Sequence, residues 1–334
     1  MKFDIGVEIG TTNTRLHFKE DVDCISMPSV IAIKKTNNQI VGIGEKAFNM
    51  IGKTPSNIVV KKTIKSGVVS DLQLNKIMMR KLLEKKYKKN FIKPKICVCF
   101  HSFLTNLEML VLKNSIFPSS SQKIYLIEES FASGIGAGFD FSNESAVLVV
   151  NIGGGTTDIS VISSQGVLIN KSVKIGTELM DEIIYKNLAK EHSFLVGMGM
   201  AEKIKKKAVT MLKPSSNLKF KLKGKDKITG LPKVLEISQE ELSKKIDLPI
   251  RRVVEEVLGL IKELSVDVTS DIQKNGILLT GGGSLTSGLK EFLQSKLQIK
   301  TTIAENNLNC AASGALKAAK FLKEEYFSDY ILPA

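Results

Sequence analysis

The chain contains no tryptophan, and aromatic residues make up only 6% of its 334 residues. Its core must therefore be built mainly from aliphatic side chains. Only four cysteines and three histidines are present, and their spacing matches no zinc motif. Cys97 and Cys99 alternate within the apolar run 96–100, which predicts a buried strand with both thiols on one side. We expect all four cysteines to be reduced core residues in a reducing compartment.

The sequence also lacks any apolar run long enough to span a bilayer, and no signal peptide is visible at its start. These features predict a cytoplasmic protein. Lysine and arginine number 48 against 34 acidic residues, which gives a formal net charge of +14. A basic balance suits nucleic acid, an anionic membrane or a nucleotide as partner. Because the lysines are spread along the whole chain, we do not expect nucleic acid binding.

The order of predicted elements indicates an α/β chain made of two related parts. A β-rich opening is followed by alternating helices and strands, and the order restarts near residue 145. Apolar spacing predicts one or two helices over 239–264, interrupted near Pro249, and an irregular loop is expected over 61–71. Strands that open the two parts are predicted over 3–9, 14–18, 146–151 and 158–163, and further helices over 72–89, 130–139, 179–191, 201–212 and 311–326.

Two similar Gly-Thr turns, 9–14 and 152–158, each follow an apolar strand in a different half of the sequence. Glycine lets the backbone approach an anion closely, and backbone N–H groups and threonine hydroxyls donate hydrogen bonds. The pair predicts a nucleotide held between two domains, although each turn alone also fits an ordinary hairpin. A third turn, 281–284, joins a strand to a helix and fits either an anion site or a tight connection. For the glycines of 134–138, close helix packing is favoured over a dinucleotide motif.

On these motifs, the chain resembles the superfamily of actin, sugar kinases and heat-shock chaperone ATPases, and within it is similar to the MreB family of bacterial actins. The resemblance runs from about residue 3 to residue 320 and is carried by segments 9–14, 28–32, 52–58, 126–129, 151–158, 201–205 and 279–283. It implies an actin-like ATPase fold, in which two related domains, each with a mixed sheet and flanking helices, surround a nucleotide cleft. The implied domain limits are 1–141 with 315–334 for domain I (its subdomain IB at roughly 30–70), and 142–314 for domain II (its subdomain IIB at roughly 181–250).

The resemblance also implies roles for residues, with ATP or ADP and Mg²⁺ as cofactors. Glu129 would orient the attacking water, assisted by Thr156 and Thr157, while Glu202 and Lys205 would contact the ribose and base. The phosphate loops and the adenosine-side turn would comprise Gly10, Thr11, Thr12, Asn13, Gly153, Gly154, Gly155, Thr156, Gly281, Gly282, Gly283 and Ser284.

Three positions depart from the family pattern. Glu8 and Asn151 stand where the family usually has the two aspartates that hold the hydrated Mg²⁺, and Ser130 replaces a proline. Glu8 keeps its charge on a longer side chain, whereas Asn151 loses the charge and so weakens attraction for a hard cation. We therefore predict that nucleotide binding is kept and that ATP hydrolysis is slow.

A basic stretch at 85–93 contains the apolar pair Phe91 and Ile92, at the position of a membrane-inserting loop in the resembled family. The alternative is a solvated helix end with Phe91 tucked beneath it. The implied partners are further copies of the chain in head-to-tail, paired protofilaments, MreB-type paralogues, and the anionic inner face of the cell membrane, where the filaments organise cell shape. Two alternatives remain open: a structural partner that binds nucleotide without hydrolysing it, and a non-polymerising, chaperone-like ATPase.

Overall fold

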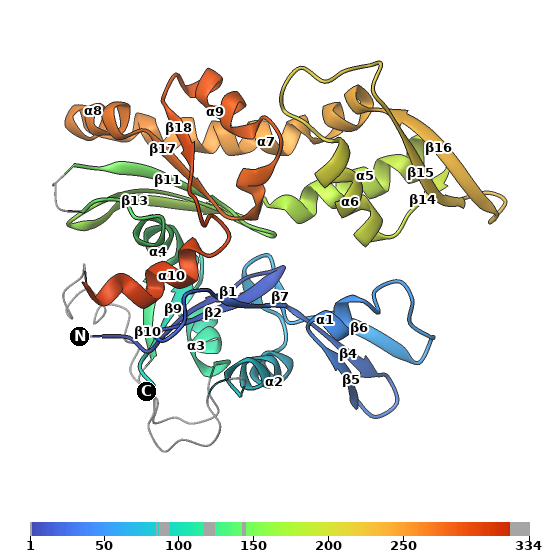
Figure 1. Cartoon of the computed structure of the whole chain (residues 1–334), viewed down its shortest axis with the longest axis horizontal. Coiled ribbons are helices and arrows are strands. Elements are labelled where there is room, and N and C mark those ends of the chain that lie inside the picture. Colours follow the sequence, from blue (N-terminus) through green and yellow to red (C-terminus); the bar gives the residue numbers. More distant parts are fainter. Residues whose placement is uncertain (1, 85, 87–93, 117–123, 142–144, 321–334) are drawn as a thin grey trace.

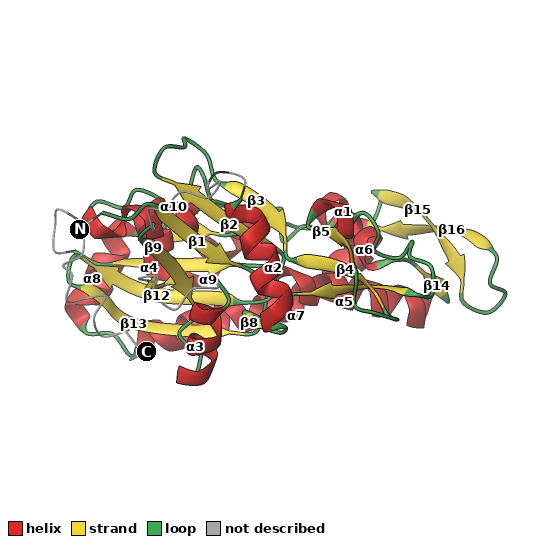
Figure 2. Ribbon diagram, turned by 90° about the horizontal axis from the view of Figure 1, so that it is seen from below, coloured by secondary structure: helices red, strands yellow, loops and turns green. Residues whose placement is uncertain are grey.

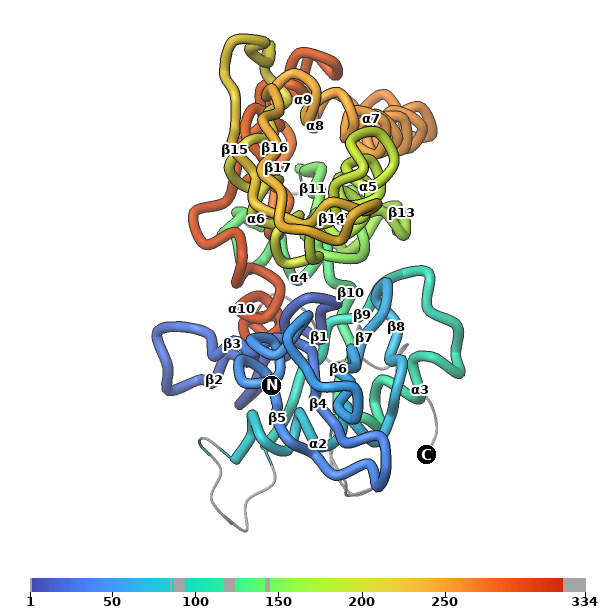
Figure 3. The backbone as a smooth tube through the Cα atoms, turned by 90° about the vertical axis from the view of Figure 1, so that its right-hand side faces the viewer, coloured from blue at the N-terminus to red at the C-terminus, as the bar shows by residue number. Residues whose placement is uncertain are grey.

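The structure is a computed structural model that describes residues 2–84, 86, 94–116, 124–141 and 145–320. Figure 1 shows two halves, one above the other, each with a larger part on the left and a smaller part on the right. Seen from below, the molecule is elongated (Figure 2), and seen from its right-hand end the halves form separate lobes (Figure 3). No helix in the described ranges combines the length and apolar character needed to cross a bilayer.

The first half is built on a five-stranded mixed sheet with the strand order β10-β9-β1-β2-β3. Its strands are β1 (Ile5–Ile9), β2 (Asn13–Phe18), β3 (Ile25–Pro28), β9 (Ile96–Phe100) and β10 (Ile124–Glu128). Strand β1 pairs antiparallel with β2 and parallel with β9, and β9 pairs parallel with β10. Helices α2 (Leu72–Leu83) and α3 (Asn106–Asn114) contribute apolar side chains to the core on one face of this sheet.

The second half repeats this plan, with the strand order β13-β12-β11-β17-β18. Its strands are β11 (Val147–Ile152), β12 (Thr157–Ser163), β13 (Gly166–Val173), β17 (Ile277–Thr280) and β18 (Thr301–Ile303). Strand β11 pairs antiparallel with β12 and parallel with β17, as β1 does with β2 and β9. The core on its outer side includes side chains of α7 (Gln239–Lys262), α8 (Val266–Asn275) and α9 (Leu289–Leu297). The predicted duplication is confirmed.

Helices α4 (Glu129–Gly136) and α10 (Cys310–Lys317) lie between the two sheets (Figure 1), and η2 (Ala318–Lys320) continues α10. One core cluster joins Cys97 and Cys99 of the first sheet with Val149 of the second. Glycine permits the close packing of the two helices, because a Cβ at Gly314 would lie 1.6 Å from the carbonyl oxygen of Ala132. Gly136 is similarly close to the backbone of α10, which supports helix packing as the role of residues 134–138. All four cysteines are free, although Cys24 is only half buried.

Each half carries a smaller three-stranded sheet at the right-hand end in Figure 1. The first has the order β5-β4-β6, with β4 (Val30–Lys34), β5 (Ile40–Ile43), β6 (Ile58–Lys62) and helix α1 (Glu45–Phe48). The second has the order β14-β15-β16, with β14 (Phe194–Leu195), β15 (Lys219–Asp226), β16 (Pro232–Ser238), α5 (Thr177–Glu191) and α6 (Met198–Ala208). The domain and subdomain limits given above stay predictions, and residues 321–334 lie outside the described part.

Two local predictions were wrong. Helix α7 runs unbroken through Pro249, because burial of its apolar face outweighs the hydrogen bond that proline cannot donate. The expected irregular loop at 61–71 contains a two-stranded hairpin of β7 (Ile64–Lys65) and β8 (Val68–Val69). Its turn residues, Ser66 and Gly67, both have positive φ, which matches the twist of a tight hairpin.

Candidate nucleotide site

A cavity of about 350 Å³ is lined by residues of both halves, including both Gly-Thr turns. The predicted site residues that line it are Glu8, Gly10, Thr11, Thr12, Asn13, Glu129, Asn151, Gly153, Gly154, Thr156, Glu202, Lys205, Gly281 and Gly282. The cavity is also lined by residues that the sequence did not single out: Arg15, His101, Thr177, Lys206, Leu285, Thr286, Ser287 and Leu308. The structure thus brings segments from across the chain to one cleft.

Four predicted residues support the lining rather than join it. The Thr157 hydroxyl donates to the carbonyl of Ile175 at 2.7 Å, and the Ser284 hydroxyl donates to the carbonyl of Gly281 at 2.7 Å. Gly283 packs against Ile152 at the start of η1 (Gly282–Leu285). Gly155 packs against Thr11 of the opposite turn, where a Cβ would lie 2.5 Å from the threonine hydroxyl.

The two Gly-Thr turns have matching geometry. Each closes the hairpin that opens its half, and the Gly10 N–H donates to Asn13 at 3.1 Å as the Gly153 N–H donates to Thr156 at 2.8 Å. The turns meet directly, since a Cβ added at Gly154 would lie 2.0 Å from the Thr12 hydroxyl oxygen. A side chain at residue 154 would displace the Thr12 hydroxyl and lie 3.1 Å from the Thr12 Cβ, so glycine allows the close contact of the two turns.

Glu178 of α5 bridges the two sides of the cleft. Its carboxylate accepts a hydrogen bond from the Thr12 hydroxyl at 3.2 Å and forms an ion pair with Lys62 of β6 at 2.5 Å. Both partners belong to the first half of the chain and Glu178 belongs to the second. These contacts hold the halves in the arrangement seen here.

Glu129 is the first residue of α4 and is buried at the inner end of the cavity. Its Oε1 accepts a hydrogen bond from the Asn151 side-chain amide at 2.8 Å, and the Asn151 oxygen accepts one from the Thr280 hydroxyl at 3.1 Å. Burial raises the pKa of Glu129 to about 8, opposed by the nearby His101. A carboxyl group in this state is protonated at neutral pH and becomes a proton acceptor only as the pH rises.

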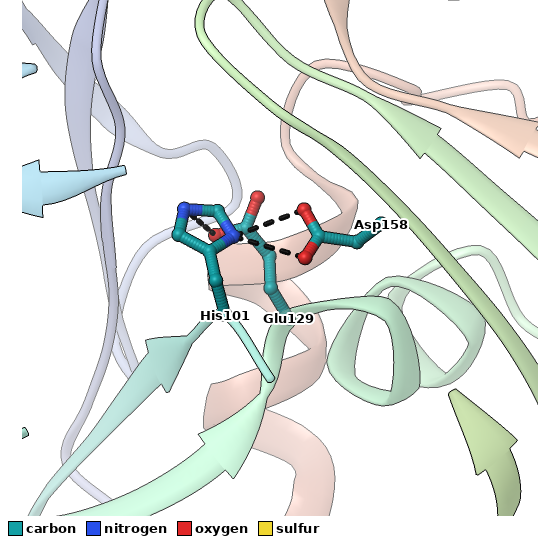
Figure 4. Close-up of side chains that lie close together, drawn as sticks. All are labelled: His101, Glu129 and Asp158. Atoms are coloured by element: carbon teal, nitrogen blue, oxygen red, sulfur yellow. Dashed lines mark hydrogen bonds and ion pairs between the residues drawn. The ribbon is translucent and has the colours of Figure 1, made fainter. Parts of the chain in front are cut away.

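His101 follows the end of β9 and joins two carboxylates (Figure 4). Its Nδ1 lies 2.9 Å from an oxygen of Asp158, and its Nε2 lies 3.7 Å from Oε2 of Glu129. Burial lowers its pKa, but the carboxylates of Asp158 and Glu129 outweigh this effect and raise the pKa to about 10. The imidazole is therefore protonated at neutral pH. The Ser172 hydroxyl also donates a hydrogen bond to the carboxylate of Asp158.

The residues expected to contact the ribose and base, Glu202 and Lys205, both form ion pairs with neighbouring side chains. Lys205 of α6 forms a 2.8 Å ion pair with Asp181 and donates to the carbonyl of Thr177 at 2.8 Å. Glu202 pairs with Lys206 one helical turn later at 2.6 Å. Burial raises the pKa of Asp181 to about 6 against the opposing charge of Lys205. The two pairs place Lys205, Glu202 and Lys206 along one wall of the cavity.

The residues implied for Mg²⁺ do not fit a hydrated divalent cation in this structure. Glu8 forms a 2.9 Å ion pair with Arg15, and both side chains are largely buried. Asn151 brings no charge, and its amide oxygen already accepts a hydrogen bond from Thr280. Mg²⁺ is usually bound through one or two carboxylates together with water and substrate phosphates, whereas here the charge of Glu8 is balanced by Arg15 and Asn151 has none. The predicted membrane residues Phe91 and Ile92 lie outside the described part of the chain.

Solved structures with the same arrangement of two halves identify the fold of this protein. The crystal structure of MreB5 of Spiroplasma citri bound to AMPPNP matches with a TM-score of 0.89 and 26% identity, over 97% of this chain and 98% of that one. The MamK double helical filament matches with a TM-score of 0.79 and 17% identity, over 96% of this chain and 99% of that one, which supports the fold alone. The protein has the actin-like ATPase fold, as predicted.

Sequence comparison gives the family. The cell shape-determining protein Mbl of Bacillus subtilis (strain 168) is 31% identical over 312 residues, which cover 93% of this chain and 94% of that protein. The cell shape-determining protein MreB of Escherichia coli (strain K12) is 29% identical over 325 residues, which cover 96% and 94%. The family described as MreB/Mbl protein matches residues 2–326. The chain belongs to the MreB/Mbl family, and the predicted resemblance is confirmed.

Proposed function

We propose that this protein binds ATP and ADP in the cleft between its halves. The observation that carries this proposal is the pair of matched Gly-Thr turns that line a cavity of about 350 Å³ from opposite halves. Backbone N–H groups in such turns are suited to phosphate oxygens. The solved MreB5 structures bound to AMPPNP and to ADP support a nucleotide of this class.

The protein assembles head to tail into filaments that organise cell shape. The names of the Mbl and MreB relatives support the role in cell shape, and MamK, which shares the fold, forms a double helical filament. Contacts between unlike faces of identical subunits produce open filaments, and nucleotide favours the closed arrangement of the two halves. Paired protofilaments and mixed filaments with MreB-type paralogues are part of the proposal.

ATP hydrolysis in these filaments is slow. In this proposal Glu129 orients the attacking water near Thr156, and the lining of the cavity by both residues supports these roles. Its raised pKa leaves it mostly protonated at neutral pH, so it accepts a proton poorly. The family resemblance implies Mg²⁺ as a cofactor, but Glu8 and Asn151, the residues implied to hold it, do not fit the cation.

The filaments lie in the cytoplasm at the inner face of the cell membrane. The formal charge of +14 and the basic stretch around Phe91 and Ile92 support binding to an anionic surface. Flotation with vesicles that contain anionic lipids tests this proposal, with neutral vesicles as the control. The double substitution Phe91→Ser and Ile92→Ser should abolish flotation. If the wild-type protein does not float with anionic vesicles, the proposed membrane binding is wrong.

Pelleting and phosphate release, measured together with ATP, test the main proposal. Wild type should pellet with nucleotide and release phosphate slowly, and Glu129→Ala should stop the release. Gly154→Ala should prevent both, because its Cβ would overlap Thr12, whereas Gly259→Ala is the matched control with no atom within 4 Å of the added Cβ. If the wild-type protein never pellets, the proposal that it forms filaments is wrong.

A second candidate function is a structural subunit that binds nucleotide without hydrolysing it. Two observations favour it: His101 lies beside Glu129, the proposed catalytic carboxylate, and the neutral Asn151 stands where the family resemblance implies an aspartate. Wild type that pellets with ATP and releases no phosphate would establish this candidate and exclude hydrolysis from the cycle.

A further inference from the structure

The inner end of the cavity has an unusual balance of charge for a site expected to hold a divalent cation. Three carboxylates lie there, those of Glu8, Glu129 and Asp158, all of them largely buried. Each has a basic partner within 4 Å, because Arg15 pairs with Glu8 and His101 lies between the other two. Because Glu129 is protonated at neutral pH, the charges of Glu8 and Asp158 are balanced by those of Arg15 and His101 before any ligand or ion binds.

Arg15 is fixed by the same hairpin that forms the first phosphate loop. It lies opposite Glu8 in the register of β1 and β2, and its Nη1 donates to Oε1 of Glu8 at 2.9 Å. The side chain lines the cavity and is only 13% exposed. A guanidinium has five N–H donors and a permanent charge, so the bond to Glu8 leaves donors for a phosphate oxygen.

His101 is fixed from three sides. Its Nδ1 lies 2.9 and 3.0 Å from the two oxygens of Asp158, and its ring stacks on Phe103 at 5.4 Å. The β7–β8 turn closes over it, because a Cβ at Gly67 would lie 2.5 Å from the imidazole. His101 also lines the cavity, beside Thr156 of the second loop. It is a rigidly placed cation at the phosphate end of the cleft.

Asn151 gives a further reason why the site does not need a divalent cation. Its amide nitrogen donates to Glu129 and its oxygen accepts from Thr280, so both polar atoms are satisfied within the protein. A carboxylate in its place would lie against Glu129, and two carboxyl groups this close either share a proton or take a cation between them. The neutral amide makes that cation unnecessary.

We propose that Arg15 and His101 act as built-in counter-charges for the nucleotide phosphates, so that this site binds ATP and ADP without a divalent cation. This inference rests on the proposed nucleotide binding in the cleft. Free ATP carries more negative charge than its Mg²⁺ complex, and the N–H donors that Arg15 keeps after its single bond to Glu8 can bind a phosphate oxygen in place of the metal. Arg15 and His101 are binding residues in this assignment, with no role in proton transfer.

The test is the affinity for a fluorescent ATP analogue, measured by anisotropy in excess Mg²⁺ and in excess EDTA. Wild type should bind in both buffers with dissociation constants that differ by less than about threefold, a difference below 1 kcal/mol. The double variant Arg15→Leu, Asn151→Asp should bind at least about tenfold more weakly in EDTA than in Mg²⁺. Gly259→Ala is the control, and it should behave as wild type does.

The outcomes separate this inference from the function on which it rests. Wild type that binds in Mg²⁺ but loses more than about tenfold of its affinity in EDTA overturns the inference and leaves nucleotide binding intact. Wild type that binds in neither buffer overturns both. The wild-type comparison needs no substitution, so it decides the inference even if the double variant does not fold.

Discussion

The rate of phosphate release should depend on pH through the buried Glu129. Burial raises its pKa to about 8, while His101, with Nε2 at 3.7 Å, opposes the rise. A group with this pKa is protonated below pH 8 and becomes an acceptor above it. If Glu129 must be ionised to activate water, the rate rises with pH, in contrast to an ordinary glutamate that is already ionised at pH 6.

The size of the effect follows from the pKa. With a value of about 8, roughly a tenth of the protein has an ionised Glu129 at pH 7, and roughly nine tenths at pH 9. The rate should therefore rise about tenfold between these pH values. His101→Gln removes the positive charge that stabilises ionised Glu129, so the same rise should move to higher pH.

Single-turnover phosphate release between pH 6.5 and about 9.5 measures this profile, within the range where Glu129 titrates. Glu129→Gln should be inactive throughout, and Gly259→Ala should reproduce the wild-type curve. A wild-type rate that is flat over this range, or a His101→Gln curve displaced to lower pH, would refute the reasoning. Either result would mean that Glu129 does not accept a proton during hydrolysis.

Three further outcomes are expected. Glu178→Gln should weaken nucleotide affinity a few fold, because it breaks the partly exposed ion pair with Lys62 that bridges the cleft. Such a pair is worth about 1 kcal/mol or less. Unchanged affinity together with unchanged amide hydrogen exchange at the cleft would contradict this expectation. Gly314→Ala should lower the melting temperature by several degrees, since its Cβ would overlap the Ala132 carbonyl and overpacking costs about 1–3 kcal/mol; calorimetry beside Gly259→Ala measures it. Asp181→Asn should destabilise the protein, because it leaves Lys205 buried without its 2.8 Å partner, and a urea midpoint equal to wild type would argue against this.

Local signals accounted for most of the fold. The Gly-Thr turns and their flanking apolar strands predicted both hairpins, and a Cβ at Gly10 would lie 2.6 Å from the Asn13 carbonyl oxygen, which shows why glycine is needed there. The alternation of lysine with other residues in 219–225 is typical of a strand with one cationic face, and the lysines of β15 are indeed exposed. These features lie within a few residues of one another, so the sequence reports them directly.

Features that depend on distant contacts were missed. Pro249 signals a break in a helix, but α7 continues because Ile246, Ile250 and Val253 are buried against the second sheet. The hairpin at 64–69 was missed because its strands have two residues each, too short for an alternating pattern. Tertiary packing decided both cases against the local signal.

The charged partners in the cleft were also missed, although strand topology contains the information to find them. Once 10–13 is recognised as a turn, residue 15 must lie opposite residue 8, so the pairing of Arg15 with Glu8 follows from the hairpin register. The parallel pairing of β9 with β10 sets Phe100 beside Glu128, so the next residues, His101 and Glu129, emerge together at the carboxyl edge of the sheet. A departure such as Asn151 is therefore best judged with the cross-strand neighbours of the site, because their charges decide whether a lost carboxylate removes a function or is balanced by a cation already in place.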